Sequence, residues 1–107
     1  MISFGMAAPT EIAGVVFVDE NGSGKYEQGE KTVSGALLLL ENGKVAKTDA
    51  YGSYTFINPS AGDHTITLKL ESLPVQYLPA VPLKKDIVVY EGITYTYDIP
   101  LKQESEN

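Results

Sequence analysis

Apolar and polar residues alternate along several short stretches of the chain, the pattern of a β-strand with one buried face. The clearest stretch is Ile93–Leu101, and Thr65–Glu71 repeats it. Both are predicted to be half-buried strands of an antiparallel sheet. Pro100 has no backbone N–H, so the last strand is expected to end near it or to lie at a sheet edge there. The residues expected to face the core are Ile66, Leu68, Leu70, Ile93, Tyr95, Tyr97, Ile99 and Leu101.

Two apolar runs, Ile12–Val18 and Ala36–Leu40, are predicted to be further strands. The second run holds four consecutive leucines but is too short for a buried helix. Asn42-Gly43 follows this run and separates it from Lys44–Thr48. An Asn-Gly pair between two strand-like segments predicts a type I′ hairpin, in which both central residues have positive φ.

Turn residues separate the remaining strand candidates. Asp49–Gly52 precedes a strand at Tyr54–Ile57, and Glu91-Gly92 follows another at Ile87–Tyr90. The proline-containing stretch Leu73–Pro82 is expected to cross between sheets. About seven short strands with frequent turns predict an all-β fold, an antiparallel β-sandwich of Ig-like architecture.

Length and composition fit one domain of this kind. The chain has 107 residues, 43% of them hydrophobic and 21% charged, with a net charge of −6. We expect a linker over residues 1–11, one sandwich over 12–101 and a polar tail over 102–107. The acidity argues against nucleic acid as a partner. No apolar run approaches the ~20 residues needed to cross a bilayer, and the absence of cysteine excludes disulfides and thiolate chemistry.

One segment carries candidate chemistry, the twelve-residue acidic loop from Asp19 to Glu30. Its oxygen-bearing residues have the spacing of an EF-hand calcium loop, with Gly24 at the sixth position, where a sharp turn is needed. Lys25, at the seventh position, would offer its backbone carbonyl, and Glu30 could close the site with both carboxylate oxygens. The residues predicted to bind calcium are Asp19, Asn21, Ser23, Lys25, Glu27 and Glu30.

The flanks of the acidic loop differ from an EF-hand. Val15–Val18 before the loop is β-branched and aromatic, and Lys31–Gly35 after it is a poor helix. The loop is therefore expected to join two strands, with the ion as a staple. Four carboxylates against one lysine give the loop a charge of −3, so it should loosen in a chelator. Asp49 is a further acid that could lie near a second ion, although one carboxylate beside a turn glycine is more often a turn residue.

Taken together, the acidic loop and the predicted strands resemble an SdrD B-type repeat. Gly14–Asp19, continuing through Gly29-Glu30 to Val33–Ala36, is similar to the opening of such a repeat. Thr48–Phe56 is similar to the T-D-x-x-G-x-Y-x-F segment, and Pro59–Ile66 stands where the repeat has its next strand. The resemblance covers about residues 12 to 78.

This resemblance implies a Cna B-type, transthyretin-like (prealbumin-like) sandwich that serves as a calcium-stiffened stalk or spacer module in bacterial surface proteins. The resemblance implies calcium ligands at the same six positions. Ser23 and Glu27 stand at two of them, where the family usually has Asn and Asp. Some Cna B-type domains hold a Lys–Asn isopeptide bond, but Val15–Val18 lacks the lysine that this bond requires. We therefore expect no isopeptide bond.

No constellation predicts an enzyme. His64, the only histidine, lies next to Asp63 and is interpreted as a solvated turn residue. Tyr51, Tyr77 and Tyr90 fall near turns, and a weak carbohydrate or protein contact through them stays open.

Three functions remain. The favoured one is a non-catalytic, calcium-stabilised spacer or presentation module of a bacterial cell-surface or secreted protein, with a relation to adhesion left open. The alternatives are a module that binds a glycan or host protein, and an accessory domain of a secreted enzyme. We expect a monomer whose partners are neighbouring domains of a larger protein.

Overall fold

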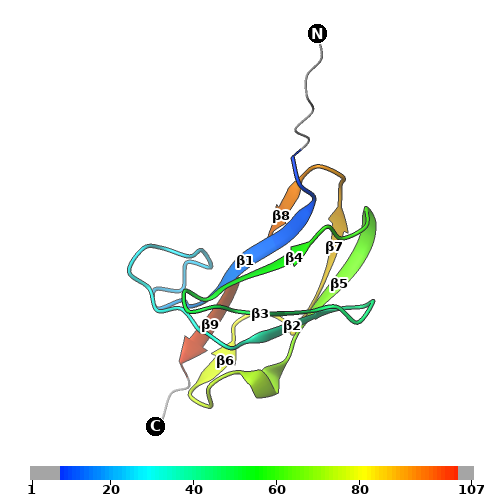
Figure 1. Ribbon diagram of the computed structural model, residues 1–107. Coiled ribbons are helices and arrows are strands. Elements are labelled where there is room, and N and C mark those ends of the chain that lie inside the picture. Colours follow the sequence, from blue (N-terminus) through cyan, green and yellow to red (C-terminus); the bar gives the residue numbers. More distant parts are fainter. Residues whose placement is uncertain (1–7, 104–107) are drawn as a thin grey trace.

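The computed structural model describes residues 8–103 and has nine strands and one short 3₁₀ helix (Figure 1). Residues 1–7 and 104–107, parts of the predicted linker and tail, lie outside the described residues. The strands begin at Glu11 and end at Gln103, against predicted domain bounds of 12–101. The elements are β1 (Glu11–Val18), β2 (Leu37–Leu40), β3 (Val45–Lys47), β4 (Ser53–Ile57), β5 (Gly62–Leu68), η1 (Leu70–Ser72), β6 (Tyr77–Pro79), β7 (Lys84–Val89), β8 (Thr94–Thr96) and β9 (Ile99–Gln103).

The strands form two sheets packed face to face, which confirms the predicted all-β sandwich. One sheet has the order β4-β1-β9-β6, with β8 also paired to β1, and the other has the order β3-β2-β5-β7. Most pairs are antiparallel, but β1 runs parallel to both β8 and β9. Because β1 and β9 run parallel in one sheet, β1 begins at one end of the sandwich and β9 ends at the other (Figure 1).

The core lies between the sheets and follows the alternation seen in the sequence. In β2, Leu38 and Leu40 are buried while Leu37 and Leu39 are only half-buried, because successive strand residues point to opposite faces. Ile66 and Leu68 of β5 are buried as predicted. Leu70 is exposed, contrary to the prediction, because the chain leaves the sheet there and enters η1.

The predicted strand Ile93–Leu101 is two strands. The chain breaks at Tyr97-Asp98, after pairing with the first half of β1, and then pairs with the second half as β9. Ile93 precedes β8 and is exposed, so its predicted place in the core is wrong. Tyr95 and Tyr97 are half-buried against the core.

Pro100 lies inside β9, between β1 and β6, and the prediction that it ends the strand or marks an edge is wrong. β6 is only three residues long, and its ladder with β9 stops at Leu101. The Pro100 carbonyl still accepts from Ala80 N at 2.9 Å. Because the ladder ends at this point, the missing N–H of proline is tolerated.

The hairpin between β2 and β3 also differs from the prediction. Only Gly43 has positive φ, +92°, whereas a type I′ turn requires it at Asn42 as well. Leu40 N donates to Lys44 O, and Gly43 N donates to Leu40 O, both at 2.9 Å. The loop therefore has three residues, with glycine in the left-handed position that such loops require.

Candidate metal centre

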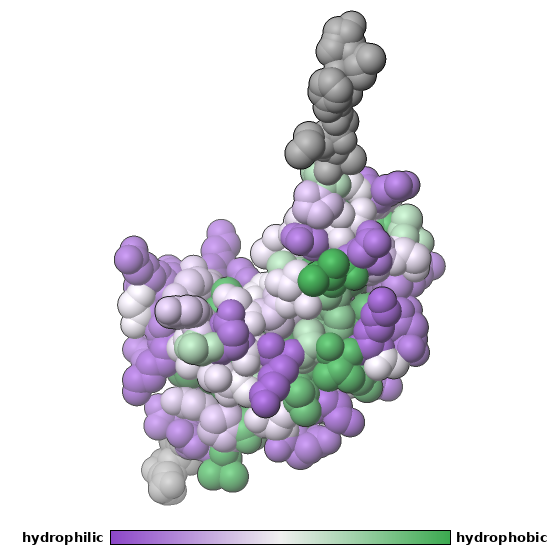
Figure 2. Space-filling view, in the orientation of Figure 1, coloured by the Kyte–Doolittle hydropathy of each residue, from purple (hydrophilic) through white to green (hydrophobic). Residues whose placement is uncertain are grey.

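The acidic loop, residues 19–30, leaves the end of β1 and returns to the same strand. Val18 N donates to Lys31 O at 2.8 Å, Val33 N donates to Val16 O at 2.9 Å, and Phe17 forms a bridge with Thr32. Asp19 N also donates to Leu101 O of β9 at 2.8 Å. Both ends of the loop are therefore fixed on the sheet, while its middle projects from the sandwich as a hydrophilic lobe (Figures 1 and 2).

The first and third positions of the loop turn their side chains toward its centre. Asp19 Oδ1 accepts from Ser23 N at 3.1 Å, and Oδ2 accepts from Gly24 N at 2.7 Å. Asn21 Oδ1 accepts from the same Ser23 N at 3.1 Å. Gly24 has a φ of +78°, which a side chain would strain. Asp19 and Asn21 thus converge on the backbone N–H of Ser23.

The fifth and seventh positions also place oxygens side by side. Ser23 Oγ donates to the carbonyl oxygen of Lys25 at 3.1 Å, and Lys25 N donates back to Ser23 Oγ at 3.2 Å. Oxygens that bind one calcium ion at ~2.4 Å stand about 3 Å apart. The separation of these two oxygens is therefore compatible with shared ligation.

The two glutamates close the loop. Asn21 Nδ2 donates to Glu27 Oε1 at 2.5 Å. The Glu30 carboxylate accepts from Glu27 N at 2.9 Å and from Glu20 N at 3.1 Å, which links the start of the loop to its end. In this arrangement the Glu30 oxygens are engaged with backbone amides.

The donor set fits a hard divalent cation, since every group is an oxygen and their order follows the calcium loop. Within residues 8–103, however, no three acidic or histidine side chains are gathered closely enough to form a metal site. Asp19, Asn21, Ser23 and the Lys25 carbonyl lie around the turn, and Glu27 and Glu30 are linked to it through Asn21 and backbone amides. Calcium binding at the loop stays a prediction.

Asp49 is a turn residue. Its Oδ1 accepts from Tyr51 N at 2.8 Å and from Ser53 N at 3.0 Å, and Gly52 N donates to the Asp49 carbonyl at 3.0 Å. This is an Asx-type arrangement that organises the turn before β4.

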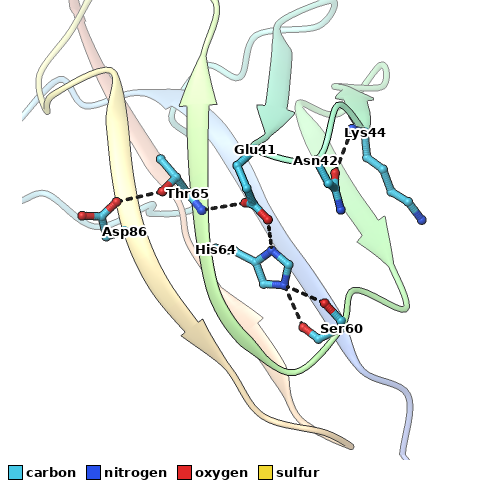
Figure 3. Close-up of polar contacts among 7 residues, drawn as sticks. All are labelled: Glu41, Asn42, Lys44, Ser60, His64, Thr65 and Asp86. Atoms are coloured by element: carbon cyan, nitrogen blue, oxygen red, sulfur yellow. Dashed lines mark hydrogen bonds and ion pairs between the residues drawn. The ribbon is translucent and has the colours of Figure 1, made fainter.

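A second polar cluster, the His64 cluster, joins His64 to Glu41 and Ser60 (Figure 3). His64 Nδ1 lies 2.8 Å from Glu41 Oε2, and Thr65 N donates to Glu41 Oε1 at 2.9 Å. The hydrogen bond from Thr65 lowers the pKa of the Glu41 carboxyl below its usual value, and the contact with His64 adds to this. His64 is only 5% exposed, so its interpretation as a solvated turn residue is wrong.

No local pattern of residues indicates this cluster, because Glu41 and His64 are far apart along the chain. The register of β2 against β5 pairs Leu40 with Ile66 and so carries Glu41 to His64 and Thr65. A register of this kind becomes known only when the strands are paired.

The His64 cluster places a serine, a histidine and a carboxylate in the same order as a serine hydrolase triad. It differs from such a triad in the position of the proton on the histidine ring. Ser60 Oγ lies 3.4 Å from His64 Nε2, on the side of the ring opposite Glu41. Nε2 is closer to the Ser60 backbone carbonyl, at 2.7 Å. A carbonyl oxygen can only accept, so Nε2 donates to it and is not free to take the proton of the serine hydroxyl. The geometry therefore favours a structural clamp between the β4–β5 turn, β5 and the β2–β3 turn.

A shallow groove of about 830 Å³ lies beside this clamp, with Asp86, Val88, Tyr90 and Tyr95 among its lining residues. Tyr90 is 63% exposed and Tyr51 is 78% exposed, as expected for tyrosines near turns. Tyr77 is half-buried and packs against the core. Among the described residues, no helix is long and apolar enough to cross a membrane.

Comparison with known proteins places the fold but not the function. No family model matches the chain. The chain is similar to Colossin-A of Dictyostelium discoideum, with 30% identity over 91 residues, which cover 80% of this chain. It spans only 1% of the length of that protein.

Two solved structures share the architecture. The minor pilin GBS52 of the Gram-positive pathogen Streptococcus agalactiae has a TM-score of 0.69 and 13% identity, over 94% of this chain and 47% of that one. The TIE protein of Bacillus anthracis has a TM-score of 0.67 and 14% identity, over 90% of this chain and 17% of that one. At this level of identity the likeness concerns the fold alone. The chain therefore has a β-sandwich fold that also occurs in a bacterial pilin.

Proposed function

We propose that this chain is a non-catalytic spacer or presentation module of a cell-surface or secreted protein, stabilised by calcium at the acidic loop. The observation that carries the proposal is the parallel pairing of β1 with β9. It places the two ends of the sandwich's chain at opposite ends of the domain, so that such domains can follow one another in series (Figure 1). The likeness to a minor pilin supports a role at a bacterial surface.

The calcium ion, as a staple, would act at the junction between β1 and the acidic loop. The backbone N–H of Asp19 donates a hydrogen bond to β9, and the Asp19 carboxylate accepts hydrogen bonds from the loop backbone. The conformation of the loop is therefore coupled to β9, the last strand of the domain. A bound calcium ion would offset the repulsion among the loop carboxylates. We expect the neighbouring domains of a longer chain to be the partners, and the isolated domain to be a monomer.

Calorimetric melting of chelator-treated protein, with and without added calcium, tests the staple. At a calcium concentration one hundred times the Kd, the folded state gains about 2.7 kcal/mol, a clear rise in Tm. Asp19→Ala and Glu30→Ala should each abolish the rise. Both carboxylates also accept backbone N–H groups, so these variants melt lower even without calcium, and the calcium-dependent increment is the quantity to compare.

Asp63→Ala is the matched control, because Asp63 is an exposed acid outside the loop. It should keep the full calcium-dependent rise. If millimolar calcium leaves the Tm of the unmutated protein unchanged, or if Asp63→Ala loses the rise as completely as Asp19→Ala, the staple is wrong.

The groove beside the His64 cluster favours ligand binding as a second candidate function. Tyr90 offers an exposed ring next to Asp86 and Val88, a combination that suits a sugar or a short peptide. A glycan array probed with the unmutated chain and with Tyr90→Ala tests this candidate. Binding lost in Tyr90→Ala and kept in Tyr51→Ala would support it, and an array without signal would remove glycans as ligands.

A further inference from the structure

The chain holds two Asn-Gly pairs, Asn21-Gly22 in the acidic loop and Asn42-Gly43 in the β2–β3 hairpin, and all four residues are exposed. Their local geometry is closely matched. Asn21 Oδ1 accepts from Ser23 N at 3.1 Å, and Asn42 Oδ1 accepts from Lys44 N at 3.0 Å. Each side-chain carbonyl is therefore held by the backbone N–H two residues further along the chain.

The two pairs differ in the backbone nitrogen of the glycine. Gly43 N donates to Leu40 O at 2.9 Å inside the hairpin. Among the hydrogen bonds of residues 8–103, Gly22 N donates none. A nitrogen whose proton is engaged in a turn is a poor nucleophile until that turn opens, whereas Gly22 is an exposed residue whose N–H has no such partner among residues 8–103.

We propose that Asn21 is a site of spontaneous deamidation, in which the backbone nitrogen of Gly22 attacks the side-chain carbonyl carbon of Asn21. The Gly22 nitrogen gives its proton to a solvent base and bonds to Cγ. The Cγ–Nδ2 bond then breaks, and the amide leaves as ammonia after taking a proton from water. Water opens the resulting succinimide at either carbonyl and yields aspartate or isoaspartate, so the net reaction consumes one water and releases one ammonia.

The contacts around Asn21 support this reaction. The hydrogen bond from Ser23 N polarises the side-chain carbonyl and would stabilise the oxyanion that forms on Oδ1 during the attack. Glycine at position 22 has no side chain to hinder the approach to Cγ. The same two features are present at Asn42, and the two sites differ in the engaged Gly43 N–H and in the hydrogen bond from Asn21 Nδ2 to Glu27 Oε1.

The reaction would alter the third position of the acidic loop permanently. Aspartate adds a negative charge there, while isoaspartate adds a backbone methylene and moves the carboxylate out of the alternating spacing. The effect on calcium rests on the proposed function. A calcium ligand at Asn21 Oδ1 would hold the side chain and the loop backbone in place, so we expect calcium to slow the reaction at Asn21 and to leave Asn42 unaffected.

Peptide mapping by mass spectrometry measures the reaction at each site as a gain of one dalton. The full chain is incubated with a chelator in mildly alkaline buffer, once folded and once unfolded in urea. In the folded protein we expect Asn21 to react about tenfold faster than Asn42, since opening one hydrogen bond of about 1.4 kcal/mol corresponds to a factor of ten. In urea the two rates should be equal, because neither glycine N–H is then engaged. Asn21→Gln should remove the fast reaction, and Asn42→Gln should leave it unchanged.

Equal rates in the folded protein, or a faster reaction at Asn42, would overturn the proposal. A third incubation with calcium separates it from the proposed function. If Asn21 is the faster site and calcium does not slow it, the modification site stands and the calcium staple loses support. If calcium raises the Tm but the folded rates are equal, the staple stands and the modification site is wrong.

Discussion

The ring of Tyr26, from the acidic loop, stands edge-on against the ring of Phe17, from β1, with centroids 5.5 Å apart and planes at 65°. Phe17 is fully buried, yet it is outside the hydrophobic cluster between the sheets. The acidic loop therefore covers an apolar side chain on the outer side of β1. Order in the loop and burial of Phe17 are coupled.

Tyr26→Ala should uncover Phe17 and lower the free energy of unfolding by about 1–2 kcal/mol, the sum of the lost aromatic contact and the lost burial. Urea denaturation measures this change. Tyr51→Ala is the control, since Tyr51 is exposed and should cost less than about 0.5 kcal/mol. Equal costs for the two variants would show that the loop does not protect Phe17.

The Glu41 carboxylate should make stability depend on acid pH. Its pKa is lowered in the folded state, so its contribution is complete above the unfolded value of 4.5 and is lost as the pH falls through the folded value. Glu41→Gln should therefore lower stability near neutral pH and flatten the loss toward acid. The side chain is 44% exposed, so solvent screening keeps the effect below about 1 kcal/mol.

Urea denaturation between pH about 3 and 7 measures this dependence. The groups that face Glu41 are His64 and Thr65, and Asp63 and Asp86 lie along the same groove. Glu91→Gln is the control, because Glu91 is an exposed carboxylate of the β7–β8 turn. If Glu41→Gln and Glu91→Gln give the same profile, Glu41 does not stabilise the fold.

Tyr54 should make the free energy of unfolding fall as the pH rises through the alkaline range, whereas Glu41 makes it fall toward acid. Its hydroxyl donates to Tyr97 O at 2.5 Å, and burial raises its pKa above the usual 10.0. A raised folded pKa means that the unfolded chain ionises first, so this contribution is present below pH 10.0 and is lost as the pH rises further. Tyr54→Phe should make the alkaline loss smaller.

At neutral pH Tyr54→Phe should cost about 1–2 kcal/mol, because the Tyr97 carbonyl loses its donor. Urea denaturation at neutral and alkaline pH measures both effects. Tyr51→Phe, at an exposed position, should leave both unchanged. An unaltered alkaline profile in Tyr54→Phe would contradict the assignment.

Gly14→Ala should be strongly destabilising because of a close approach rather than because of backbone conformation. A Cβ at Gly14 would lie 1.9 Å from Tyr97 O and 2.6 Å from its carbonyl carbon, where the chain crosses from β8 to β9. We expect a loss of about 3 kcal/mol or more in chemical denaturation. Gly35→Ala is the control, since its φ is +83° but nothing lies within 4 Å, and it should cost only about 1–2 kcal/mol. Similar losses in the two variants would contradict the clash.

The Asn-Gly pair correctly predicted a hairpin, but not its type. Local residues decide that the chain must turn at Asn42-Gly43, while the pairing of the flanking strands decides how many residues the turn contains. Pro100 shows the same limit. Proline excludes a ladder bond at its own nitrogen, but the end of the β6 ladder decides whether such a bond is needed there.

Within this protein, the alternation of residue types determined most of the strands and most of their inner-facing residues, and the composition from Asp19 to Glu30 determined an acidic loop after the first strand. Both are local properties, because they depend on the successive residues along one segment. The parallel pairing of β1 with two strands, the cover that Tyr26 gives to Phe17 and the contact of Glu41 with His64 were decided only by the tertiary structure. Each joins segments distant in sequence, and their meeting depends on strand order and register, which are set by the packing of the whole core.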